Sequence, residues 1–94
     1  MRPLLDRLRV HDRDLADQLR RALSSIALNL AEGDGSRGGN RVARFSTALG
    51  SVREARAALR VAIAWGYVST DDVAEGDALL DRVAAMLYRL GARR

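Results

Sequence analysis

A polar stripe interrupts an apolar segment in the first half of the chain. Ser25, Asn29 and Glu32 are spaced by four and three residues, which places them on one side of a helix. Isoleucine, leucine and alanine cover most of the remaining circumference, and a helix that is apolar nearly all round is buried on more than one side. Because buried polar groups need partners, the stripe either hydrogen-bonds across a helix interface near Gly50 and Ser51 or lines a ligand pocket.

The arginines are the second feature of the chain that could take part in binding. The chain has sixteen arginines and no lysine against twelve acidic residues, for a net charge of +4. Guanidinium groups present a planar fork of donors that suits phosphates and carboxylates. Two groups are spaced to act together, and they consist of Arg37, Arg41 and Arg44, and of Arg53, Arg56 and Arg60. They either contact the phosphate backbone of a nucleic acid or are solvated and paired with acidic groups on neighbouring helices.

Residue patterns typical of enzymes and metal sites are missing. The chain has no cysteine, which excludes disulfides and thiolate chemistry. His11 is the only histidine, and no glutamate stands three residues before it, as in the metal sites of helical bundles. The glycine-rich segment lacks the lysine and hydroxyl of a Walker loop. We therefore predict no catalytic residue, no metal and no cofactor; an enzyme would need an unrecognised mechanism based on Glu32 or Glu54.

Helical segments are expected to position these residues. The first is short, because only about ten residues precede His11. Asp12 is placed to cap a second helix of about twenty residues that ends at Gly33. Four glycines among residues 33–39 predict a loop, and Asn40 is placed to cap the third helix after it.

The second half of the chain continues in the same way. Gly66 is placed to end the third helix, and Ser69 to cap a fourth that ends at Gly91, before two arginines at residues 93–94. No segment alternates like a strand, and no apolar stretch is long enough to predict a signal peptide or a membrane span. Residues 1–94 are therefore predicted to form one all-α domain in the cytoplasm, with no membrane contact.

The third predicted helix has apolar residues on two opposite sides. One side carries Phe45, Leu49, Val52, Leu59 and Ile63, and the other carries Ala43, Glu54, Ala58, Val61 and Trp65. A helix with two apolar faces has two contact surfaces, one inside the bundle and one outside it. We expect a second copy of the chain to cover the outer surface, with Glu54 meeting an arginine of the neighbouring subunit.

Two ordered motifs support a family assignment. They are Asn-x-Ala-Glu-Gly at residues 29–33 and Gly-Ser-x-x-Glu at residues 50–54. With them, residues 12–92 resemble the bacterial four-helix-bundle family of proteins encoded in 23S ribosomal RNA intervening sequences. Relatives of that family include the accessory variability determinant proteins of diversity-generating retroelements. The resemblance implies structural roles for Asn29, Glu32, Gly33, Gly50, Ser51 and Glu54.

The resemblance also implies an assembly and partners. The family forms ring-like homopentamers, and the retroelement relatives bind nucleic acid and a reverse transcriptase. We therefore predict an all-α, up-and-down four-helix bundle with a shortened first helix, which acts as a non-enzymatic, self-assembling accessory factor that contacts RNA or DNA. The alternative is a structural protein–protein interaction module with no nucleic-acid binding. Pairing of Arg53, Arg56 and Arg60 with carboxylates would favour this alternative.

Overall fold

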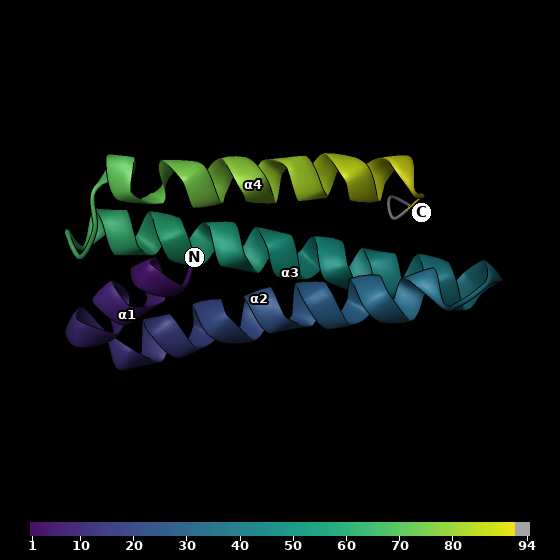
Figure 1. The fold of residues 1–94 in the computed structure, drawn as a ribbon, viewed down its shortest axis with the longest axis horizontal. Helices are drawn as coiled ribbons and strands as arrows, with labels where there is room; N and C mark the ends of the chain where they lie inside the picture. Colours follow the sequence, from purple (N-terminus) through teal and green to yellow (C-terminus); the bar gives the residue numbers. More distant parts are fainter. Residues whose placement is uncertain (92–94) are drawn as a thin grey trace.

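The chain folds into antiparallel helices. The computed structural model describes residues 1–91, which form four helices and no strand (Figure 1). The helices are α1 (Arg2–His11), α2 (Arg13–Asp34), α3 (Gly38–Ala64) and α4 (Thr70–Arg89). Helices α2, α3 and α4 lie side by side, and each runs opposite to the one before it. The all-α, up-and-down bundle is confirmed, and the arginines at residues 93–94 lie outside the described residues.

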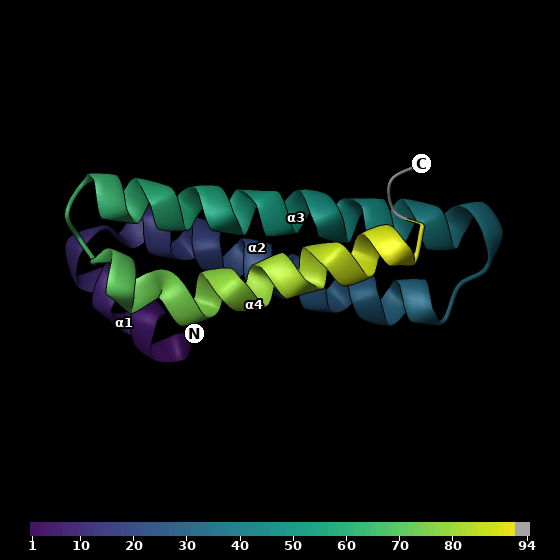
Figure 2. The ribbon, with the colours of Figure 1, turned by 90° about the horizontal axis from the view of Figure 1, so that it is seen from above.

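Helix α1 fills the fourth position at one end of the bundle only (Figures 1 and 2). It has 10 residues against 22 in α2, so at a rise of about 1.5 Å per residue it spans less than half of its neighbour. Leu8 of α1 is fully buried, and Arg7 Nη1 lies 2.7 Å from Asp72 Oδ1 in α4. The shortened first helix is thus confirmed, and α1 bridges α2 and α4 at that end.

Most of the predicted helix boundaries are confirmed. Asp12 Oδ1 accepts a hydrogen bond of 3.0 Å from the backbone N–H of Leu15, which caps α2. Ser69 and Asp72 form a capping box at the start of α4, with reciprocal hydrogen bonds of 2.8 and 3.1 Å. Gly66 adopts φ 76° directly after α3, a conformation that glycine reaches without a steric cost. These short-range signals fix where α2 and α4 begin and where α3 ends.

The connection between α2 and α3 is shorter than predicted. Helix α2 continues to Asp34, and α3 begins at Gly38 after Arg37. Asn40 therefore lies inside α3, and its predicted capping role is wrong. Ser36 Oγ donates a hydrogen bond of 2.6 Å to the Glu32 carbonyl oxygen, which satisfies a carbonyl at the end of α2 that the helix leaves free. Gly35 within the connection and Gly38 after it, the latter at φ 59°, allow the chain to reverse within three residues.

The core lies mainly between α2 and α3. Leucine, isoleucine and phenylalanine form its centre, and buried alanines let the helix backbones approach each other. Its largest members with less than 2% exposure, or close to it, are Leu8, Leu19, Phe45, Val52, Leu59 and Leu87. Ala58 is also buried, at 6% exposure. Its predicted place on the outer side of α3 is therefore wrong, because it faces α2.

Close packing also explains one glycine of the sequence motif. A Cβ atom at Gly33 would lie 2.7 Å from Cδ1 of Phe45 and would overlap its ring. Gly50 differs, because a Cβ atom there would have nothing within 4 Å. Gly50 therefore makes no close contact, and the tight contact between α2 and α3 lies at Gly33.

Candidate functional site

The polar stripe of α2 forms hydrogen bonds within the protein. Asn29 Nδ2 donates to the carbonyl oxygen of Ser25 at 2.9 Å and to its Oγ at 3.2 Å. Ser51 Oγ of α3 donates to Ser25 Oγ at 2.7 Å. Asn29 and Ser51 are only 7% and 5% exposed. Of the two alternatives for this stripe, the geometry corresponds to a hydrogen-bonded link across the α2–α3 interface.

The first arginine group lies at the start of α3 and is partly engaged. Arg44 Nη1 lies 2.8 Å from Glu32 Oε2 in α2. The Arg41 guanidinium carbon lies 5.1 Å from the ring centroid of Phe45, within the range of a cation–π contact. For the Arg37 side chain, no ion pair or hydrogen bond is found among residues 1–91. Arg44 is thus offset by a carboxylate of its own chain, whereas Arg37 and Arg41 keep a net positive charge.

The second arginine group also contains one residue that is paired with carboxylates and others that are not. Arg56 donates from Nε to Asp77 Oδ1 at 3.0 Å and from Nη1 to Asp81 Oδ1 at 3.1 Å. The hydrogen bonds with Asp77 are the main cause that raises the pKa of Arg56 above its usual value. Arg53 Nη2 donates instead to the hydroxyl of Tyr88 at 2.8 Å. Because this hydroxyl is neutral, the contact does not offset the positive charge of Arg53.

Sequence reasoning had left carboxylate pairing open as an alternative, and the structure shows it for Arg44 and Arg56. Arg56 is held by two carboxylates, with which a phosphate would have to compete for the guanidinium. Its inclusion in the nucleic-acid site stays a prediction. Asp77 and Asp81 were not singled out together, although their spacing of four residues on α4 placed them on one side of that helix. For the Arg60 side chain, an ion pair or hydrogen bond is again not found within residues 1–91.

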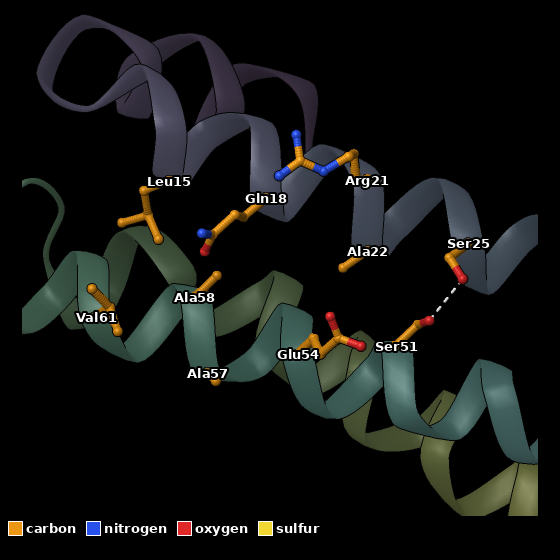
Figure 3. A pocket seen from close by; sticks show the side chains of 10 residues that line it. All are labelled: Leu15, Gln18, Arg21, Ala22, Ser25, Ser51, Glu54, Ala57, Ala58 and Val61. Atoms are coloured by element: carbon orange, nitrogen blue, oxygen red, sulfur yellow. Dashed lines mark hydrogen bonds between the residues drawn. The ribbon is translucent and has the colours of Figure 1, made fainter.

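A groove between α2 and α3 is the most developed concave feature near the predicted site residues (Figure 3). Its volume is about 450 Å³. The groove is bordered by Arg21 on α2 and Glu54 on α3, and both side chains are exposed. Its inner surface consists largely of small residues, and the Ser25–Ser51 hydrogen bond closes one end. Sequence reasoning missed this groove and Arg21, because neither helix alone reveals where the two walls meet.

The side of α3 that faces away from the core carries few charges. Val61 and Trp65 are 42% and 71% exposed on it. Ala43, Gly50 and Ala57 also lie on this side according to the helical spacing, and Glu54 is its only ionised side chain. Within the described part of the chain, the Glu54 side chain has no hydrogen bond or ion pair. This set of residues, from Ala43 to Trp65 on the outward side, is called the outer face of α3 below.

Two further observations limit the chemistry of the described residues. Among residues 1–91, no three histidine, aspartate or glutamate side chains gather closely enough to hold a metal ion. In the same range, every helix is too short or too rich in charge to cross a membrane.

These features define an all-α helical-bundle protein with a two-sided central helix. A family model described as 23S rRNA-intervening sequence protein matches residues 7–89, and the chain belongs to this family. The matched range includes the second half of α1 and all of α2, α3 and α4. The comparison with curated proteins and the comparison with solved structures returned no match.

Proposed function

We propose that this protein is a non-enzymatic bundle that assembles with copies of itself and uses arginine-lined surfaces of the assembly to contact RNA or DNA as an accessory factor. The outer face of α3 carries the first half of the proposal. A solvent-facing side of a helix normally carries charged and polar residues, whereas this one exposes Val61 and Trp65 and has Glu54 as its only charge. Covering it with a second copy would remove this apolar surface from water.

The arginines support the second half of the proposal. Arg37, Arg41, Arg53 and Arg60 keep their charge without a carboxylate partner among residues 1–91. In an oligomer each of these residues is repeated, so a modest patch becomes an extended positive surface. Such a surface attracts nucleic-acid backbones with little sequence preference, and its binding weakens steeply as salt rises.

The resemblance to ring-forming relatives makes a homopentamer the assembly that we propose. The same resemblance makes a reverse transcriptase the first protein partner to test. Sedimentation velocity and native mass spectrometry measure the subunit number. A protein that stays monomeric at all accessible concentrations would contradict self-association.

Nucleic-acid binding is tested by fluorescence anisotropy with labelled RNA and DNA over a salt titration. We expect a double variant Arg37→Gln/Arg60→Gln to weaken binding and to lower the slope of log K against log salt by roughly 0.9 for each lost phosphate contact. The double variant Arg82→Gln/Arg89→Gln is the matched control, because it removes the same charge from exposed positions of α4. Equal losses in both variants would mean that net charge, rather than these arginines, determines binding.

A structural interaction module without nucleic-acid binding is the second candidate. The ion pairs of Arg44 with Glu32 and of Arg56 with Asp77 and Asp81 favour it, because they neutralise part of the basic surface. Self-association combined with no binding of RNA or DNA even at low ionic strength would support this candidate over the first.

A further inference from the structure

We propose that Trp65 of one copy of the chain docks into the α2–α3 groove of the next copy, where Glu54 accepts its indole N–H and Arg21 lies against its ring. This inference rests on the self-association proposed above and assigns the side chain and the receiving site that form the contact.

The side chain of Trp65 has no partner among residues 1–91. Trp65 is 71% exposed, and no hydrogen bond or ring contact of its side chain is found within the described range. Tryptophan buries roughly 150–250 Å² when it is fully covered, and it is enriched among the residues that dominate interface energies. An indole left in water on an otherwise weakly charged face is therefore the strongest candidate for a residue that another molecule covers.

The groove has the size and chemistry for an indole. A volume of about 450 Å³ accommodates a tryptophan side chain, and alanines and serines along the inner surface leave this space unfilled (Figure 3). Figure 3 shows the Glu54 carboxylate and the Arg21 guanidinium on opposite walls of the groove. An indole N–H is a donor without an acceptor function, so the carboxylate matches its edge. A guanidinium matches the electron-rich face of the ring.

Trp65 cannot reach the Glu54 carboxylate of its own groove. Val61, four residues before Trp65, lines one end of the groove, but Glu54 precedes Trp65 by eleven residues on α3, so at about 1.5 Å per residue these two positions lie roughly 16 Å apart along a rigid helix. An indole that contacts Glu54 must therefore come from another molecule. Every copy carries both Trp65 and the groove, so the contact repeats from one copy to the next, as in a closed ring.

The test uses Trp65 as its own reporter, because the chain contains one tryptophan. Emission wavelength and acrylamide quenching are measured over a concentration series in which sedimentation velocity follows association. We expect the emission to shift to the blue and quenching to fall as the oligomer forms. In Glu54→Ala, we expect association to weaken by about tenfold or more, since a hydrogen bond to a charged group is lost.

Two leucine substitutions separate filling of the groove from added bulk elsewhere on the surface. Ala57→Leu fills the groove, whereas Ala27→Leu adds the same bulk at an exposed position of α2 that does not line it. We expect Ala57→Leu to leave Trp65 exposed and to weaken association, and Ala27→Leu to behave like the parent. Circular dichroism checks that both variants are folded.

The outcomes distinguish this inference from the proposed function. An oligomer in which Trp65 stays exposed, or in which Ala57→Leu still buries it, overturns the docking contact and leaves self-association standing. A protein that is monomeric throughout overturns both. Burial of Trp65 only when a different protein or a small molecule is added also overturns the contact between copies.

Discussion

The contact between Gly33 and Phe45 leads to a sharp prediction about stability. In Gly33→Ala the new methyl carbon would lie 2.7 Å from Phe45 Cδ1 and 3.2 Å from Cζ, whereas carbon atoms attract each other best at about 3.5–4.0 Å. The ring is 2% exposed, so it cannot move aside without disturbing the core. Overpacking of this kind costs about 1–3 kcal/mol, and the helix propensity of alanine returns at most about 1 kcal/mol near a helix end.

We therefore expect Gly33→Ala to lower the free energy of unfolding by about 1–2 kcal/mol. Urea unfolding followed by circular dichroism, at one fixed protein concentration because association adds to apparent stability, measures this change. In thermal unfolding, each kcal/mol corresponds to a decrease of about 4–8 °C in Tm for a domain of this size.

Gly39→Ala is the control for this experiment, because a Cβ atom at Gly39 would have nothing within 4 Å. We expect this variant to be as stable as the parent or slightly more stable. Phe45→Leu combined with Gly33→Ala should recover part of the loss, with a coupling of at least about 0.5 kcal/mol. If Gly33→Ala were as stable as Gly39→Ala, the reasoning from close packing would be refuted.

Three further predictions concern polar contacts, and each is measured by urea unfolding. Arg56→Gln should lose up to about 1 kcal/mol, since its ion pair with Asp77 is partly solvated; an unchanged stability in both Arg56→Gln and Asp77→Asn would contradict a stabilising pair. Asp72 has a pKa held below its usual value, chiefly by a backbone hydrogen bond at the helix cap, so its contribution is complete above the unfolded pKa of about 4 and is lost as the pH falls through the folded pKa. Asp72→Asn should accordingly make the decline in stability below about pH 4 shallower, and an unaltered pH profile would count against it. Ser51→Ala should cost about 0.5–1.5 kcal/mol by removing the hydrogen bond to Ser25, whereas Ser24→Ala, at an exposed position of α2, should change little.

Local signals in the sequence were sufficient to predict the helices of the fold. Helical periodicity, the Asp12 and Ser69 caps and Gly66 depend on residues within a few positions of each other, and they predicted the all-α bundle and most helix ends. The two-sided character of α3 was also readable from spacing, and Val61 and Trp65 are exposed as that spacing requires. The helix boundaries around Asp34 and Gly38 were misjudged, because glycine is compatible with both a loop and a helix terminus, and the spacing also placed Ala58 on the wrong side of α3.

The tertiary structure alone decided which polar groups are paired and which remain available. Arg56 and Arg60 have the same type and lie on one helix, yet Arg56 meets two carboxylates of α4 and Arg60 meets none among residues 1–91. The same holds for the glycines, since Gly33 lies against Phe45 and Gly50 lies against nothing. Periodicity specifies the direction of a side chain around its own helix, but the rotation and separation of the helices specify what it meets. These depend on how all the buried side chains pack together, which no local pattern contains.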